Sequence, residues 1–226
     1  MIAENLSLLS KKIPSNIQLV AVSKTKPNEL LMQAYDHGQR HLGENKVQEL
    51  VSKHESLPKD INWHFIGHLQ RNKVKYIAGF VHLIHGVESL KLLKEIDKQG
   101  QKNNRIINVL LQFHIAEETS KFGLNLLEAQ QLLIDEAYLG FSNICISGVM
   151  GMATFTDNTE QVRNEFRTLK SIYNDLKMSF FKDSDDFKVI SMGMSGDYEI
   201  AIEEGSTLIR VGSSIFGARD TPICCR

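Results

Sequence analysis

The sequence predicts a single (β/α)8 barrel, the TIM-barrel fold, with an N-terminal helix. Three observations lead to this fold class: β-branched runs alternate with helical patterns, eight such runs occur, and 226 residues leave no room for a second folded domain. Strands that alternate with helices pair in parallel, because each crossover returns the chain to the same end of the sheet. Such a barrel takes about 250 residues, so we expect one domain over residues 1–226. An open doubly wound sheet is the alternative.

The elements follow in order from an expected N-terminal helix within residues 1–12. The eight expected strands, short runs rich in β-branched and apolar residues, cover residues 18–23, 41–43, 63–67, 81–87, 105–115, 145–150, 188–192 and 207–211. Apolar residues at three- and four-residue spacing fill the segments between them, for example Leu30, Leu31, Ala34 and Tyr35. This spacing predicts the helices that connect parallel strands.

The composition favours a small-molecule ligand over a nucleic acid or a membrane. The 26 Lys and Arg residues nearly balance 27 Asp and Glu residues, so the chain has no excess positive charge to attract phosphate backbones or anionic lipids. Its three cysteines, Cys145, Cys224 and Cys225, suggest no disulfide framework and favour a reducing compartment. The first residues lack the apolar run of about 7 residues of a secretory signal, and no stretch approaches the roughly 18 apolar residues of a membrane span. We therefore expect a cytoplasmic protein.

In a barrel of this kind, functional residues lie at the carboxyl ends of the strands and in the loops that follow. The first expected strand leads into Lys24, which has the parity of Val20 and Val22 and so points to the same face. Lys26 falls where the chain leaves for the next helix, so Lys24 is the better candidate for the barrel interior. Burial lowers the pKa of a lysine and makes its amine a nucleophile that can form a Schiff base with a carbonyl. The alternative is a lysine at a strand end with its ammonium group in water.

The last two strands lead into an expected anion site. After the seventh strand the chain passes through glycine and serine into a helix, with Ser195 as the expected N-cap, and backbone N–H groups at such a helix start attract phosphate. On the eighth strand Arg210 and Gly212 share a face, and glycine lets backbone amides approach a ligand. Loops after strands seven and eight often hold phosphate in these barrels, which strengthens the prediction.

The histidines and carboxylates predict no further chemistry. His64 and His68 have the spacing of a zinc-binding helix, but their segment is an expected strand, where four residues span about 13 Å. We therefore expect no metal site. The pair Glu203 and Glu204 is explained as part of an exposed helical face rather than as an acid and base pair.

Several ordered motifs carry a family resemblance along nearly the whole chain. They are LVAVSKTKP at 19–27, GEN at 43–45, HFIG at 64–67, LQ at 69–70, NK at 72–73, SMGMS at 191–195, RVG at 210–212 and IFGAR at 215–219. With them the chain resembles the pyridoxal 5′-phosphate homeostasis proteins, single-domain relatives of the alanine racemase barrel. It departs from the usual pattern at His114, where relatives more often have asparagine, and at His68, where many have proline.

The resemblance implies a fold-type-III barrel that holds pyridoxal 5′-phosphate as a Schiff base on Lys24. The other cofactor-binding positions that it implies are Arg210 at the pyridine nitrogen, Ser195, Gly212 and Ser213 at the phosphate, and Asn45 and Met192 along the ring. No catalytic residue is expected.

The leading hypothesis is therefore a non-catalytic cofactor-binding protein involved in vitamin B6 and amino-acid homeostasis, a monomer or weak homodimer. The alternative is an amino-acid racemase or decarboxylase of the same fold, although the racemases add a second β domain that contributes a tyrosine base, for which 226 residues leave no room. A Schiff-base aldolase acting on a phosphorylated sugar is compatible with Lys24 and the phosphate signals, but the motifs do not support it.

Overall fold

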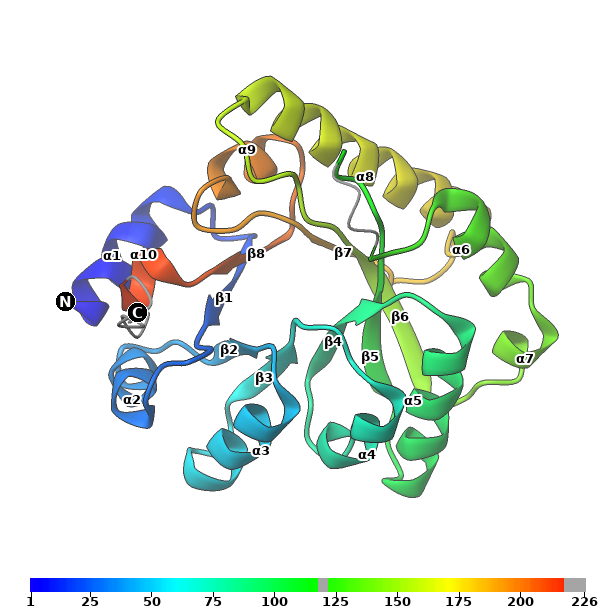
Figure 1. The fold of residues 1–226 in the computed structure, drawn as a ribbon, viewed down its shortest axis with the longest axis horizontal. Coiled ribbons are helices and arrows are strands. Elements are labelled where there is room, and N and C mark those ends of the chain that lie inside the picture. Colours follow the sequence, from blue (N-terminus) through cyan, green and yellow to red (C-terminus); the bar gives the residue numbers. More distant parts are fainter. Residues whose placement is uncertain (118–121, 218–226) are drawn as a thin grey trace, which may run out of the picture.

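The chain forms a closed barrel of eight parallel strands in sequence order (Figure 1). The computed structural model describes residues 1–117 and 122–217. The strands are β1 (Gln18–Val22), β2 (His41–Glu44), β3 (Asn62–Phe65), β4 (Leu83–Val87), β5 (Ile107–Gln112), β6 (Ile144–Met150), β7 (Val189–Ser191) and β8 (Leu208–Val211). Each of them overlaps one of the eight predicted strands. Because β1 pairs with β8, the sheet closes, and the alternative of an open doubly wound sheet is wrong.

Helices surround the barrel on its outer side (Figure 1). They are α1 (Ile2–Lys12), α2 (Asn28–Asp36), α3 (Val47–Ser56), the 3-10 turn η1 (Arg71–Lys73), α4 (Val74–Ile77), α5 (Leu90–Lys102), α6 (Leu126–Leu133), α7 (Glu136–Leu139), α8 (Thr159–Ser179), α9 (Tyr198–Glu203) and α10 (Ser213–Phe216). The predicted N-terminal helix is confirmed as α1. It lies beside α10, where the Asn5 side chain donates a hydrogen bond to the carbonyl oxygen of Ile215 at 2.9 Å.

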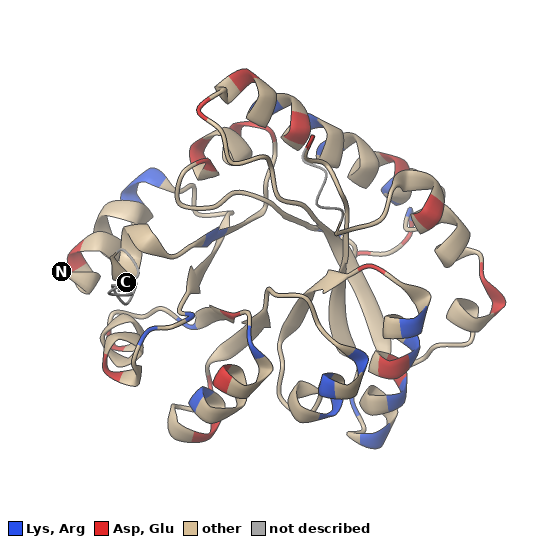
Figure 2. Cartoon of the chain, in the orientation of Figure 1, with Lys and Arg blue, Asp and Glu red and all other residues tan. Residues whose placement is uncertain are grey.

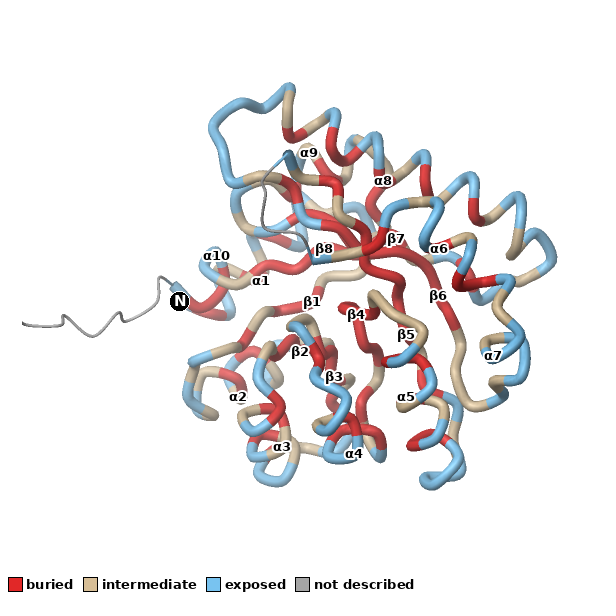
Figure 3. The backbone as a smooth tube through the Cα atoms, turned by 45° about the vertical axis from the view of Figure 1, so that its right-hand side comes forward, coloured by how far each residue is buried: buried red, intermediate tan, exposed pale blue. Residues whose placement is uncertain are grey.

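The alternation of side chains along the strands produces two apolar layers. Val20, Leu83 and Leu110 are among the residues that form a small cluster inside the barrel, whereas Ala21 and Trp63 belong to the larger layer between the sheet and the helices. Figure 3 shows the buried residues along the barrel and the exposed residues on the outer helix faces. The strand parity that predicted an inward face for Val20 is therefore confirmed.

Lys, Arg, Asp and Glu are interspersed over the outer helices (Figure 2). In the described part of the chain, no helix combines the length and apolar character needed to cross a bilayer. The inside of the barrel is different, because buried polar side chains lie beside its apolar cluster. They include His64, His85, Ser191 and Arg210.

Candidate functional site

Lys24 lies at the carboxyl end of the barrel, two residues beyond the last residue of β1. Val20, four residues earlier, is fully buried in the cluster inside the barrel. Lys24 itself is half-buried in the turn after the strand, so its inward orientation stays a prediction from strand parity. Thr25 follows with a φ of 64°, a left-handed conformation that is uncommon for a residue other than glycine. The chain therefore turns sharply immediately after Lys24.

A cluster of polar residues fixes this turn from the outer side of the barrel. We call Ser23, Glu44, Glu49 and Lys53 the Lys24-loop cluster. Glu49 Oε1 accepts hydrogen bonds from the backbone N–H of Thr25 at 2.6 Å and from Lys53 Nζ at 2.7 Å. Lys53 Nζ also donates to the carbonyl oxygen of Ser23 at 2.8 Å and to Glu44 Oε1 at 2.7 Å. The residues on both sides of Lys24 are thus tied to helix α3.

Burial makes this cluster energetically different from a surface ion pair. Glu44 is fully buried, and burial raises the pKa of its carboxyl group, while Lys53 and the 2.6 Å hydrogen bond from Ser23 Oγ favour the charged form. A charged group in such a place needs its partner, because an unpaired buried charge is strongly destabilising. None of the sequence motifs indicated this cluster. Its only local signal was the four-residue spacing of Glu49 and Lys53 on α3.

Arg210 lies on β8 with its guanidinium inside the barrel. It stands opposite Val20 in the β1–β8 register and is 4% exposed. Its Nη1 donates a hydrogen bond to Ser191 Oγ, and its Nη2 donates to the carbonyl oxygen of Gly151 at 3.1 Å. Burial lowers the pKa of Arg210 to about 10, partly opposed by the nearby carboxylate of Asp197. The side chain therefore remains a charged hydrogen-bond donor at neutral pH.

The loops after β7 and β8 meet, as the predicted anion site requires. The backbone N–H of Gly212 donates to Ser195 Oγ at 3.1 Å. Ser213 is exposed and is the first residue of α10. The structure therefore brings together three of the residues predicted to hold the phosphate.

The prediction of Ser195 as a helix N-cap is wrong. Helix α9 begins only at Tyr198, and its N-cap is Asp197. The physical reason is a tight turn in which Asp197 Oδ1 accepts the backbone N–H of Met194 at 2.5 Å, which delays the start of the helix. Gly193 enters this turn with a φ of 97°, and a Cβ there would lie 2.7 Å from the Cβ of Ala201. Glycine is therefore needed for α9 to pack against this loop.

The two residues predicted to line the ring have different environments. Asn45 is half-buried directly after β2, and a Cβ at Gly67 would collide with its carbonyl oxygen, so the ends of β2 and β3 are packed tightly. Met192 is fully buried in the layer between sheet and helices. The preceding residue, Ser191, points into the barrel toward Arg210. The contact between Met192 and the cofactor ring stays a prediction, and the position of Met192 on the outer face of the sheet does not favour it.

Other sequence predictions concern residues that are not among the expected cofactor-binding positions. His64 is buried within the barrel, whereas His68 is exposed and lies 3.3 Å from Glu88, so these two histidines do not converge. Glu203 and Glu204 form ion pairs with Arg163, in agreement with a structural role. Ala218, Arg219, Cys224 and Cys225 lie outside the described residues.

A cavity of about 670 Å³ lies between α1, the loop before α9 and the start of α10. Ser195, Gly196 and Ser214 are on its wall, together with residues of α1, but Lys24 and Arg210 are not. It adjoins the expected phosphate loops from the outer side of the barrel. We therefore do not assign the ring of a cofactor to it.

Comparison with known proteins gives consistent matches over most of the chain. The family model for the N-terminal domain of alanine racemase matches residues 1–220. A pyridoxal phosphate homeostasis protein from Aquifex aeolicus is 39% identical over 203 residues, which cover 89% of this chain and 87% of the relative.

Solved structures agree with this result. The chain is similar to PipY from Synechococcus elongatus, solved without pyridoxal phosphate (TM-score 0.89) and with it bound (TM-score 0.84), at 32% identity over 96% of this chain and all of PipY. An alanine racemase from Clostridium difficile shares the fold with a TM-score of 0.78 at 12% identity, and the match covers 98% of this chain but 60% of the racemase chain.

Proposed function

Because the chain belongs to the family of pyridoxal phosphate homeostasis proteins, we propose that it binds pyridoxal 5′-phosphate at the carboxyl end of its barrel, as a Schiff base on Lys24. In this proposal the protein is not an enzyme. It binds the cofactor reversibly and acts in vitamin B6 and amino-acid homeostasis. We further propose a cytoplasmic location and a monomer or weak homodimer, with neither a nucleic acid nor a membrane as partner.

The buried cation inside the barrel is the observation that carries this proposal. Arg210 keeps a charged guanidinium at 4% exposure, on the strand that adjoins the one leading to Lys24. A buried charge is costly unless it is paired or used. The hydrogen bonds of Arg210 inside the barrel go to a hydroxyl and a carbonyl oxygen, and the carboxylate of Asp197 lies nearby. A donor in this position suits the pyridine nitrogen of the cofactor, while the amine of Lys24 suits its aldehyde.

The loops after β7 and β8 suit the phosphate group. They offer the hydroxyls of Ser195 and Ser213 and the backbone around Gly212. Hydrogen bonds to a charged phosphate contribute roughly 1.5–3 kcal/mol each. Two such bonds are enough for the phosphate to increase affinity by at least about a hundredfold. We expect pyridoxal without phosphate to bind more weakly by that factor, as measured by spectroscopic titration, and equal affinities would remove these loops from the site.

The surroundings of Arg210 also support the absence of turnover. Arginine does not give up its proton, so it leaves the pyridine nitrogen unprotonated, and the cofactor then withdraws electrons poorly. Efficient catalysis would need a well-placed acid and base. Tyr198 donates to Glu199 on α9 at 3.0 Å, and Tyr76 is half-exposed on α4. In the described part of the chain, neither tyrosine hydrogen-bonds to the Arg210 guanidinium. The racemase match shows the fold alone.

Two measurements on the purified protein test the proposed function. Addition of pyridoxal 5′-phosphate should produce a visible absorbance band, and the loaded protein should exchange the α-proton of alanine or serine in deuterated water no faster than the free cofactor does. Enzyme-like exchange that is lost in Lys24→Ala would reject the carrier function and favour a racemase or decarboxylase. No visible band at saturating cofactor would reject the Schiff base.

A further inference from the structure

Three histidines converge at the amino end of the barrel, opposite the end that carries Lys24. His41 is the first residue of β2, His64 lies in β3, and His82 immediately precedes β4. Ligand atoms of these three imidazoles all lie within 4.8 Å of one another. His64 belongs to one of the family motifs, whereas His41 and His82 belong to none of those quoted above, and none of the three is among the expected cofactor-binding residues. We call these three residues the triple-histidine cluster.

Strand register creates the cluster. In the β2–β3 pairing, His41 stands opposite Asn62 and Gly43 opposite His64, so His41 and His64 follow each other on the inner face of adjacent strands. His41 Nδ1 and His64 Nε2 are 2.9 Å apart. The ring of His82 completes a triangle, with its centroid 5.4 Å from that of His41 and 5.2 Å from that of His64.

The imidazoles are in the protonation state that metal binding requires. Burial lowers the pKa of His41 to about 4, lowers the pKa of His64 well below its usual value, and lowers that of His82 as well. At neutral pH all three rings are therefore uncharged, and each has a nitrogen lone pair. Neutral imidazole is the form in which histidine binds metal ions.

Hydrogen bonds to His85 and Ser191 orient the central histidine, His64. His64 Nδ1 lies 2.9 Å from His85 Nε2, and His85 Nδ1 lies 2.9 Å from Ser191 Oγ. If His64 directs the lone pair of Nε2 toward an ion, its proton is on Nδ1 and points at His85. A histidine ligand that donates its other N–H to a fixed acceptor is the usual arrangement in metal sites.

We propose that His41, His64 and His82 form a binding site for a divalent transition metal ion of the zinc type, with water as the remaining ligand. Three imidazoles and a water are an established ligand set for zinc, with Zn–N bonds of about 2.0–2.1 Å. Tetrahedral geometry then sets the ligand nitrogens about 3.3 Å apart. The 2.9 Å contact between His41 and His64 must open by a few tenths of an ångström, and ligand nitrogens that are up to 4.8 Å apart must move closer together. This proposal replaces the expectation of no metal site, which rested on His64 and His68 alone.

One neighbouring charge opposes the ion and provides a further test. Arg105 lies near enough to lower the pKa of His82, and its guanidinium donates to the carbonyl oxygens of Ala78 and Val81. A positive charge close to the site weakens the binding of a dication. Replacement by the neutral Arg105→Gln should therefore tighten metal binding.

The experiment is a titration of the cofactor-free full chain with Co²⁺, followed by displacement with Zn²⁺. Wild-type protein should bind one ion per chain with the visible spectrum of a tetrahedral cobalt site. His82→Gln and His41→Gln should each lose at least about tenfold in affinity, since even replacing a residue that only hydrogen-bonds to a metal ligand has an effect of that size. His68→Gln is the matched control, because His68 is exposed and remote from the cluster, and it should bind as the wild type does. The double variant Cys224→Ser/Cys225→Ser excludes the two C-terminal thiols as ligands and should bind as the wild type does.

Thermal unfolding with and without Zn²⁺ provides a second readout for variants that fold. An ion that binds the native state raises the midpoint, so Zn²⁺ should raise it in the wild type and in His68→Gln but not in His82→Gln. Absence of cobalt binding in the wild type would overturn the proposal, and so would equal affinity in the wild type and His82→Gln. Because the titration uses cofactor-free protein, neither result depends on the Schiff base at Lys24.

Discussion

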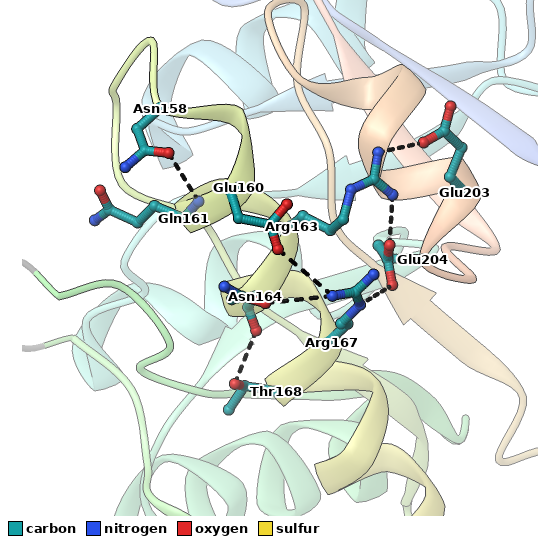
Figure 4. A network of polar contacts seen from close by, with 9 residues as sticks. All are labelled: Asn158, Glu160, Gln161, Arg163, Asn164, Arg167, Thr168, Glu203 and Glu204. Atoms are coloured by element: carbon teal, nitrogen blue, oxygen red, sulfur yellow. Dashed lines mark hydrogen bonds and ion pairs between the residues drawn. The ribbon is translucent and has the colours of Figure 1, made fainter.

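Two networks of ion pairs in this protein both join basic side chains to glutamates, but they differ in burial. In the Lys24-loop cluster, the lysine Lys53 lies between Glu44 and Glu49, and the side chains of Lys53 and Glu44 are 7% and 0% exposed. On the outer surface, Arg163 of α8 pairs with Glu203 and Glu204 (Figure 4), and we call these residues, with Arg167 and Glu160, the α8–α9 network. Most of its side chains are more exposed, with Arg167 at 54% and Glu203 at 60%, while Arg163 is 26% and Glu204 12% exposed.

The difference shows where the fold uses charge to fix position. Exposed ion pairs contribute little, because water and salt screen them and long side chains lose conformational freedom when they pair. In the buried cluster, Glu49 accepts a hydrogen bond from the backbone N–H of Thr25, and Lys53 donates one to the carbonyl oxygen of Ser23. Its charged groups therefore hold the turn that contains Lys24. We therefore expect the buried cluster to affect both stability and cofactor binding, and the α8–α9 network to affect neither strongly.

The largest effect is expected for Lys53→Met. This change removes the cation and leaves Glu44 buried without its ion-pair partner, which typically costs about 3–5 kcal/mol of the free energy of unfolding. Part of this loss will be relieved if Glu44 takes up a proton. Urea unfolding measures the stability change, and the visible absorbance band at saturating pyridoxal 5′-phosphate measures cofactor binding under conditions where the variant is folded.

The double variant Lys53→Met/Glu44→Met separates stability from position. Replacing a buried ion pair by apolar side chains of similar volume is often neutral or stabilising, so it should recover much of the lost stability. Cofactor affinity should remain reduced, because no cation then holds Ser23 and Glu49. Recovery of both properties would contradict a positioning role for the cluster.

A smaller effect is expected for Glu49→Gln. The amide still accepts a hydrogen bond from Thr25, but it loses its charge beside Lys53, and hydrogen bonds to charged groups contribute about 1.5–3 kcal/mol each. Cofactor affinity should fall severalfold as the turn loosens. Glu55→Gln is the matched control, since Glu55 is exposed on the same helix. Equal cofactor affinities for the two variants would mean that Glu49 does not fix the turn.

The smallest effect is expected for Arg167→Ala. Its guanidinium is 3.0 Å from Glu204 and 3.7 Å from Glu160 on the exposed side of α8, and pairs of this kind contribute less than about 1 kcal/mol. The urea midpoint should shift little, and the shift should shrink further at high salt. A loss as large as that of Lys53→Met would remove the distinction between the two networks.

The sequence was sufficient to predict the barrel and the strand residues that point into it. Strand parity depends on local alternation, so it correctly directed Val20 inward, and the repeated strand and helix pattern set the topology. The start of α9 was predicted wrongly because serine is favoured in turns as well as at helix N-caps. The Asp197 side chain accepts a hydrogen bond from the backbone N–H of Met194, so Ser195 lies in a turn and Asp197 is the N-cap.

Contacts between distant segments could not be read from local patterns. His41, His64 and His82 are separated by whole β/α units, and only the register of β2 against β3 brings the first two together. The Lys24-loop cluster likewise joins the end of β1 to helix α3. Such contacts follow from the closed sheet, so they become visible only after the strands are aligned.

The proposed function requires the aldehyde of pyridoxal 5′-phosphate to be bound to Lys24 and not to Lys26. Borohydride reduction of the loaded protein, followed by peptide mapping, identifies the lysine, because reduction makes the link permanent. We predict label on Lys24 in the wild type and in Lys26→Ala, and none at this segment in Lys24→Ala. Label on Lys26 in the wild-type protein would show that the assignment to Lys24 is wrong.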